Sequence, residues 1–262
     1  MIYIMEVLAI ALIMIMSQIG SGQEASEAKA IWESAIKAKG GRNALAKINN
    51  ILIQYTSPSR TTSGRAYERE ETALTVLPDK VWSYTDERPE VFGEFVSMLN
   101  YEKMIQYFGP KGSSEISTKP IPDKDRTRKD YQNSTIFYLM ESKWLKPKPL
   151  GVKEDTLGSE KVLIVQTNVD GRRVDFALNR SNYLPTKIIT YDTDVDGVVR
   201  AHEMTLSNYI EIDGIKIPRT AKYDMFGTKN LTVRFNVNYD PSIFTHVPNE
   251  LGPDAWQRKE LK

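Results

Sequence analysis

The stretch that decides the fold is NYIEIDGIKIPRTAKYDMFGTKNLTVRFNVNY, residues 208–239. In its last part apolar and polar side chains alternate, with the apolar ones at Leu231, Val233, Phe235, Val237 and Tyr239. Because successive side chains of a strand point to opposite faces, this pattern predicts a strand with one apolar face. Asp213-Gly214 separates two alternating segments, and Asp-Gly is the strongest short signal for a β-hairpin.

Two further Asp-Gly pairs lie upstream between apolar alternations, at Asp170-Gly171 and Asp196-Gly197. A type I′ turn needs positive φ at both central residues, which Asp and Gly tolerate. Residues 161–239 are therefore predicted to form a meander of about six antiparallel strands with one apolar face.

The middle pair lies in YDTDVDGVVRAHEM, residues 191–204, which also fits the spacing of a calcium-binding EF-hand loop. An EF-hand needs a helix on each side of its loop, whereas the flanking sequences here are β-branched and typical of strands. A two-residue turn would place Asp192, Asp194 and Glu203 on one face, where carboxylates repel unless solvated or bridged by a cation. We predict a hairpin that needs no metal, with calcium binding as the alternative.

Residues 24–50 and 125–145 are predicted to be helical, and strand patterns fill most of the chain from residue 51 to residue 108. The second helical segment carries a broad apolar surface behind a charged first half, and KPKP at residues 146–149 ends it. This helix either packs on the sheet or covers an apolar cavity as a lid.

The N-terminus predicts export. Residues 7–16, VLAIALIMIM, form an apolar run of signal-peptide length that is too short to span a membrane, and small residues follow it. We expect a signal peptide over residues 1–23 and a mature chain that begins between Gly22 and Ala25. The segment before the run has no Lys or Arg and carries Glu6, so a retained membrane anchor is the alternative.

Composition excludes several classes of function. The chain of 262 residues has a formal net charge of +1, which favours neither nucleic acid nor an anionic membrane surface. Cysteine is absent, so thiol catalysis, cysteine-ligated metals and lipid modification of a cysteine are excluded. The histidines are His202 and His246, and no hydrolase, zinc-protease or P-loop motif surrounds them. We therefore predict no enzyme, no cofactor and no resident metal.

Two segments carry a resemblance to a known family. NYIEIDGIKIPRTAKYDMFG resembles the strand, tight turn, G-x-x-[IL]-P and next strand of the LolA-like family of outer-membrane lipoprotein-sorting proteins. FNVNYDPSIFTHVP is similar to the family's final strand followed by D-x-x-x-F-x-x-x-P, carried here by Asp240, Phe244 and Pro248. The resemblance covers most of residues 25–248.

The resemblance implies an α+β fold in which a curved antiparallel sheet forms an incomplete barrel, with helices over its concave face and acyl chains in an apolar cavity. It places this half-barrel in a single domain over residues 24–250, followed by a tail over residues 251–262. The periplasmic carrier of the family uses an arginine from an early strand to control its lid. Arg60, Arg65 and Arg69 lie in the comparable region, and none of them is singled out.

We therefore expect an exported, periplasmic, monomeric protein that binds a lipid or the acyl chain of a lipoprotein and serves outer-membrane lipoprotein sorting. The residues predicted to line its cavity are Phe137, Met140, Trp144, Val233, Phe235 and Val237. Two alternatives stay open. One is a periplasmic sensor or scaffold of the same fold that binds an envelope protein partner, and the other is an envelope hydrolase.

Overall fold

The computed structural model describes residues 24–61, 63–86, 94–100, 103–108, 115–120, 135–193, 196–223, 227–246 and 252–257. The predicted signal peptide and Asp194 of the calcium-like motif lie outside these residues. Within them, no helix has the length and apolar character that crossing a membrane requires.

The described strands follow one another in the hydrogen-bonded order β6-β5-β4-β3-β2-β1-β13-β12-β11-β10-β9-β8-β7. The strand pairs whose register is defined are antiparallel. The order ends at two different strands, so the sheet is open and does not close into a barrel. Together with its few helices, this confirms the predicted fold class, an α+β protein built on an open antiparallel sheet.

The chain gathers into two compact units. Unit 1 combines the residues up to Ala38 with Pro147–His202, and unit 2 combines Lys39–Lys146 with Glu203–Lys262. Strand β11 (Val199–Ile212) begins in unit 1 and continues in unit 2. Unit 2 is thus built from two stretches of sequence that are far apart along the chain.

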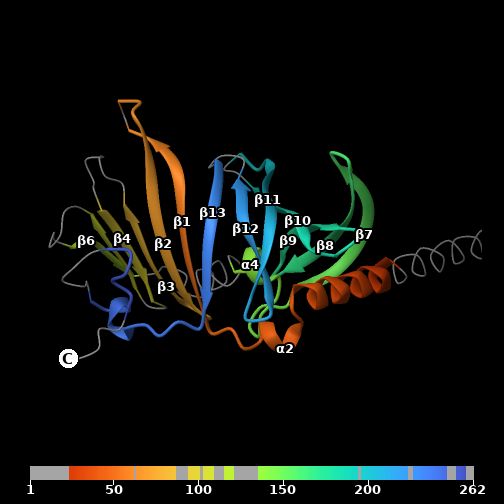
Figure 1. Ribbon diagram of the computed structural model, residues 1–262, viewed down its shortest axis with the longest axis horizontal. Coiled ribbons are helices and arrows are strands. Elements are labelled where there is room, and N and C mark those ends of the chain that lie inside the picture. The colour runs from red at the N-terminus through yellow and green to blue at the C-terminus, as the bar shows by residue number, and fades with distance from the viewer. Residues whose placement is uncertain are drawn as a thin grey trace, which may run out of the picture. The chain divides into compact units, whose positions relative to one another are not determined.

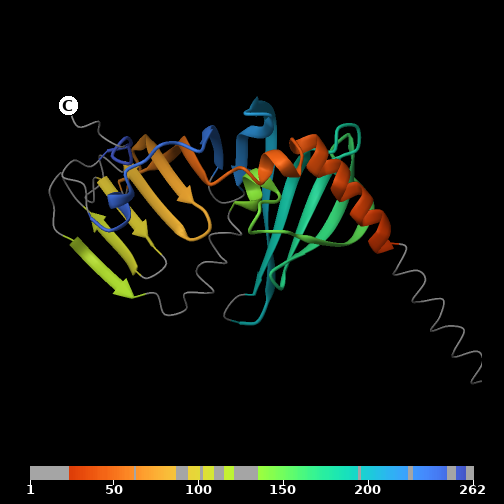
Figure 2. The ribbon, with the colours of Figure 1, turned by 90° about the horizontal axis from the view of Figure 1, so that it is seen from below.

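Unit 1 is a sheet with a helix along one face. Its strands are β7 (Lys148–Leu157), β8 (Glu160–Val169), β9 (Arg172–Asn179), β10 (Pro185–Thr193) and the start of β11. Residues 24–39 are helical, and this helix lies along β7 to β9 in both views (Figures 1 and 2). Trp32 of the helix packs edge-on against Phe176 of β9, with ring centroids 5.0 Å apart, which fixes the helix on the apolar face.

The described part of unit 2 holds the remaining strands and three short helices. The strands are β1 (Asn50–Arg60), β2 (Ala66–Val76), β3 (Lys80–Asp86), β4 (Glu94–Leu99), β5 (Lys103–Phe108), β6 (Glu115–Pro120), β12 (Ile215–Tyr223) and β13 (Gly227–Phe235). The helices are α2 (Arg42–Leu45), α4 (Ile136–Leu139) and the 3₁₀ helix η1 (Pro241–Phe244).

The second predicted helix is shorter than the sequence pattern indicates. Its described part is helical only at Ile136–Leu139, and the prediction that the helix runs to residue 145 is wrong. Met140 adopts a φ of 63°, which cannot continue an α-helix. Ser142 then accepts hydrogen bonds at Oγ from the backbone N–H groups of Trp144 and Leu145, which folds the following residues into a turn.

The sheet of unit 2 has two buried faces. We call the first the tail face, because η1 and Trp256 pack there against Leu52 of β1, Leu74 of β2 and Trp82 of β3. The C-terminal segment lies beside β3 and β4 in both views (Figures 1 and 2). We call the opposite face the helix face, because α4 contacts β12 there through Tyr138 and Tyr223. It carries the alternate residues Ile51, Ile53, Leu231, Val233 and Phe235, all of them buried.

Candidate functional site

A cluster of polar side chains lies on the helix face beyond the apolar residues. Its members come from β1, β2, β12, β13 and α4, and we call it the polar cluster: Tyr55, Arg69, Glu71, Tyr138, Tyr223 and Lys229. The register places them together, because Tyr55 of β1 pairs with both Glu71 of β2 and Leu231 of β13.

The Glu71 carboxylate is the centre of the polar cluster. Arg69 donates from Nε to Oε1 of Glu71 at 2.9 Å, and a second guanidinium nitrogen lies 2.7 Å from the same oxygen. The Tyr55 hydroxyl donates to Oε2 of Glu71. The side chain of Glu71 is only 18% exposed, so these charge-assisted bonds form in a partly desolvated setting.

Lys229 is held between two aromatic rings. Its Nζ lies 4.1 Å from the ring centroid of Tyr55 and 5.2 Å from that of Tyr223, both within cation–π range. The same nitrogen is 4.0 Å from Oε1 of Glu71, and the lysine side chain is 12% exposed. Burial lowers the pKa of Lys229, and the nearby Glu71 carboxylate opposes this only in part.

The three tyrosine hydroxyls of the polar cluster keep their protons at neutral pH. Burial is the largest cause of a raised pKa at Tyr55, Tyr138 and Tyr223. Tyr138 of α4 and Tyr223 of β12 are joined by a side-chain hydrogen bond, and α4 contacts β12 (Figure 1). Protonated hydroxyls can both donate and accept, and two of the three hydroxyl protons are donated within the polar cluster, one to Glu71 and one between Tyr138 and Tyr223.

The helix face changes from polar to apolar along its strands. On β13, Lys229 is followed at alternate positions by Leu231, Val233 and Phe235. On β1, Tyr55 stands opposite Leu231, while Ile53 and Ile51 stand opposite Val233 and Phe235. We call these five apolar residues of β1 and β13 the apolar strip. It begins directly beside the polar cluster.

The residues predicted to line the cavity lie on more than one surface of unit 2. Val233 and Phe235 lie in the apolar strip, Met140 is buried at the end of α4, and Phe137 and Trp144 are half-buried. Their role in binding a ligand stays a prediction.

Val237 does not continue the alternation. Asn236 has a φ of 50° just after β13 ends, and Val237 then packs against the core of the tail face. Its backbone N–H donates to Oδ1 of Asn50 at 2.9 Å, and its carbonyl accepts from Nδ2 of Asn50 at 3.1 Å. The side chains of Val237 and Phe235 therefore lie on opposite faces of the sheet.

The polar cluster was not predicted, although part of its signal is visible in the sequence. Lys229, Leu231 and Val233 are alternate residues of one predicted strand, so the pattern places a cation on an otherwise apolar face. Its partners Tyr55 and Glu71 become visible only through the cross-strand register. Of the arginines in the comparable region, Arg69 of β2 binds Glu71 here, whereas the exposed Arg60 at the end of β1 donates to the Gly64 carbonyl.

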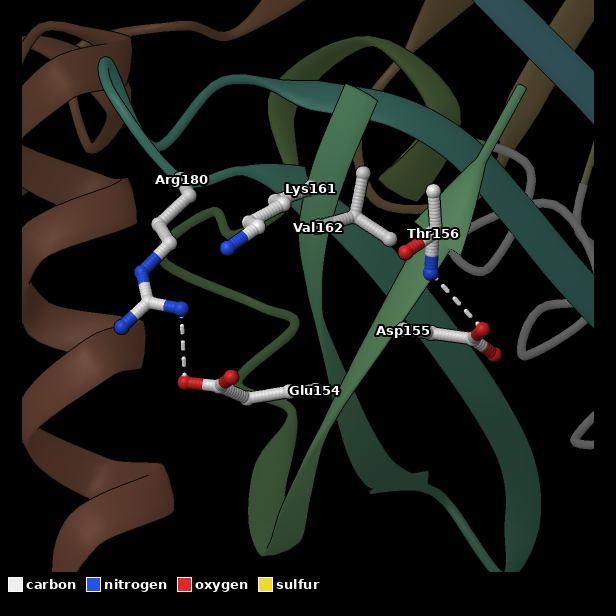
Figure 3. Close-up of a pocket in the computed structure, with 6 residues that line it drawn as sticks. All are labelled: Glu154, Asp155, Thr156, Lys161, Val162 and Arg180. Carbon is white, nitrogen blue, oxygen red and sulfur yellow. Dashed lines mark hydrogen bonds and ion pairs between the residues drawn. The ribbon is translucent and has the colours of Figure 1, made fainter. Parts of the chain in front are cut away.

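A hollow in unit 1 is lined mainly by charged residues. It has a volume of about 160 Å³ and is lined by Glu154, Asp155, Thr156, Lys161, Val162 and Arg180 (Figure 3). Arg180 and Glu154 lie 2.8 Å apart, with side chains 51% and 65% exposed. Asp155 accepts a hydrogen bond from its neighbour Thr156. Exposed pairs of this kind contribute about 0–1 kcal/mol, so the hollow is a weak candidate site.

The segment with calcium-loop spacing is flanked by strands. β10 ends at Thr193, β11 begins at Val199, and Gly197 between them has a φ of 79°. The described residues contain no group of three or more acidic or histidine side chains placed to hold a metal ion. His202 Nε2 lies 3.8 Å from Oδ2 of the exposed Asp192. The strands on both sides agree with a hairpin rather than an EF-hand.

No protein-family model matches the sequence, and no curated protein matches it. Solved structures do match. A putative outer membrane lipoprotein-sorting protein domain from Vibrio parahaemolyticus shares 14% identity, with 84% of this chain and 97% of that chain covered and a TM-score of 0.44. The LolA superfamily protein NE2245 from Nitrosomonas europaea shares 14% identity, with 81% and 96% covered and a TM-score of 0.49.

A third match is the MucA/MucB complex structure of Pseudomonas aeruginosa, at 9% identity with 79% and 92% covered and a TM-score of 0.21. The solved structures similar to this chain thus include LolA-superfamily and lipoprotein-sorting proteins, as the sequence resemblance predicted. Matches with identities and TM-scores this low carry no argument about function, which has to be argued from this chain's own residues.

Proposed function

We propose that this chain is an exported protein that binds a lipid, or the acyl chain of a lipoprotein, without covalent chemistry, on the helix face of unit 2. The observation that carries the proposal is the lengthwise change on that face, from the polar cluster to the apolar strip. An amphiphile likewise consists of a polar head group followed by an apolar chain.

The dimensions support this assignment. On β13 the apolar strip runs over four residue steps, from Leu231 to Phe235, which at about 3.4 Å per residue is roughly 14 Å. Each leaflet of a bilayer's hydrocarbon core is about 15 Å thick, so the strip matches one extended acyl chain in length.

Burial of the acyl chain supplies the affinity. Each methylene removed from water contributes about 0.8 kcal/mol, so a long chain binds tightly without any catalytic group. The apolar strip is buried in this structure, and α4 and Met140 lie in the same unit. Binding therefore requires the side chains that cover the strip to give way to the ligand.

Export rests on the N-terminal sequence, and a role in lipoprotein sorting at the outer membrane follows from the resemblance together with lipid binding. The decisive experiment is native mass spectrometry of the protein purified from its own cell envelope. We expect a co-purified lipid or lipopeptide whose mass is lost on organic extraction. A chain that carries no amphiphile, and takes up none when lipids are added, would contradict the proposal and leave the protein-partner alternative.

A further inference from the structure

We propose that the polar cluster recognises an anionic head group, a carboxylate or a phosphate, and that Lys229 and Arg69 are its charged contacts. This inference rests on the proposed function, because the head group belongs to the amphiphile whose chain lies along the apolar strip.

The position of Lys229 carries the first step. Its ammonium lies on the helix face, at the end of the apolar row Leu231, Val233 and Phe235. A ligand whose chain follows that row brings its polar end to Lys229. A head group placed elsewhere on the row would bury its own polar atoms against apolar side chains, at a cost of about 1–3 kcal/mol per unsatisfied group.

The charge of the head group follows from the neighbours of Lys229. The rings of Tyr55 and Tyr223 attract cations, but the lysine ammonium already lies 4.1 Å and 5.2 Å from them. A second cation there would meet like charge at close range. Within the polar cluster, two cationic side chains surround the single carboxylate of Glu71. An anionic group is the head group that these charges stabilise.

The protonation state of Lys229 points the same way. Desolvation lowers the pKa of Lys229 more than Glu71, 4.0 Å away, restores it. A further anion near the ammonium would compensate this desolvation, since opposite charge favours the charged form of lysine. One hydroxyl proton of the Tyr138–Tyr223 pair is used in the hydrogen bond that joins them, so this pair can offer at most one O–H donor to a carboxylate or phosphate oxygen.

The test compares three ligands with one acyl chain and different head groups: palmitate, palmitoyl lysophosphatidate and the neutral monopalmitoylglycerol. Isothermal titration calorimetry on the full-length mature protein measures their affinities below the concentration at which each forms micelles. We expect the two anionic ligands to bind at least about ten-fold more tightly than the neutral one. The ratio of the two anionic affinities distinguishes a carboxylate site from a phosphate site.

Substitutions that are expected to weaken anion binding, and one that is expected to strengthen it, separate a role in recognition from a structural role. Lys229→Met is expected to reduce the anionic affinities to the level of the neutral ligand, and Lys229→Arg to retain most of the preference. Glu71→Gln removes the competing carboxylate and is expected to tighten anionic binding several-fold, a gain that mere damage to the fold would not produce. Lys222→Met, at an exposed lysine of the neighbouring strand β12, is the matched control and is expected to change nothing.

Two results would overturn the inference in different ways. Equal affinity for all three ligands, with no loss in Lys229→Met, would refute the head-group site while the proposed lipid binding stands. If none of the three ligands binds, the proposed function itself fails and the head-group site with it. Circular dichroism and thermal unfolding of each variant ensure that only folded protein is compared.

Discussion

The Nζ atom of Lys39 lies 5.2 Å from the ring centroid of Tyr209, and the lysine is almost completely buried, with 1% of its surface exposed. A lysine ammonium is strongly hydrated in water, so its burial is costly even above an aromatic face. Burial lowers the pKa of Lys39 from 10.5 to about 7.

This burial predicts a stability that rises with pH. Between about pH 7 and 10.5 the unfolded chain holds a proton on Lys39 that the folded chain has released, so the free energy of unfolding increases across that window. Below pH 7 both states are protonated and the full cost of burial remains. We expect Lys39→Met to be more stable than the wild type, with the largest gain below pH 7. Urea unfolding at pH 6, 8 and 9.5 measures this, and Lys37→Met at an exposed position is the control.

Gly40 is predicted to be intolerant of any side chain. It has a φ of +133°, and a Cβ atom there would lie 2.4 Å from the carbonyl oxygen of Gly214, which is backbone and cannot rotate away. We expect Gly40→Ala to lower the free energy of unfolding by about 3 kcal/mol or more. Gly41→Ala, at φ 85° and ψ 154° with open space around it, carries the backbone strain without the clash and should cost less, about 1–2 kcal/mol. Equal losses in denaturant titrations would contradict the close approach of the two backbones.

The ion pair of Arg42 and Glu141 is predicted to matter more than ion pairs at the surface. Arg42 Nε lies 2.7 Å from Oε1 of Glu141, whose side chain is 5% exposed against 46% for the arginine. Removing the guanidinium leaves a buried carboxylate without this partner, so Arg42→Gln is expected to cost about 2–3 kcal/mol. Arg180→Gln, which breaks the exposed pair with Glu154, should change stability by about 0.5 kcal/mol or less. Chemical denaturation of both variants compares them directly.

The two faces of the unit 2 sheet predict different effects on lipid binding. Phe235 lies in the apolar strip and Val237 packs on the tail face, so Phe235→Ala is expected to weaken palmitate binding about ten-fold and Val237→Ala to leave it unchanged. The half-buried Trp144 supplies a readout, since its fluorescence should shift to the blue when a fatty acid enters. A shift that survives in Phe235→Asp would contradict binding along the strip.

The segment with calcium-loop spacing is predicted to bind no calcium at physiological concentration, because strands rather than helices flank it. Calorimetric titration of the protein with calcium chloride should show no saturable heat in the micromolar range. Micromolar binding that disappears in Asp194→Ala would show instead that the carboxylates of this segment form a real site.

The parts of the fold that depend on local pattern could be predicted from the sequence. Alternation at Leu231, Val233 and Phe235 gave the strand and its apolar face, and the Asp-Gly pairs gave the turns, since Asp170 and Asp213 both adopt a φ of 50°. These signals lie within a few residues of the elements they determine.

Other features depend on contacts that the sequence does not display. Asn236 interrupts the alternation with a left-handed φ, a conformation that asparagine tolerates but does not require, so the position of Val237 could not be predicted. Met140 ends α4 although methionine favours helices. The polar cluster joins Tyr55, Glu71 and Lys229, and only the strand register shows that they meet.

The packing of Trp256 on the tail face has a consequence for how the protein is made. This side chain is 3% exposed and lies in one core with Leu52 and Trp82, more than 170 residues earlier in the chain. Synthesis delivers the N-terminal strands first, so their apolar surface stays uncovered while residues Pro147–His202 of unit 1 and then η1 emerge. During that interval β1 to β5 form a surface prone to aggregation, and a chaperone that shields it until residues 252–257 arrive would raise the yield of folded protein.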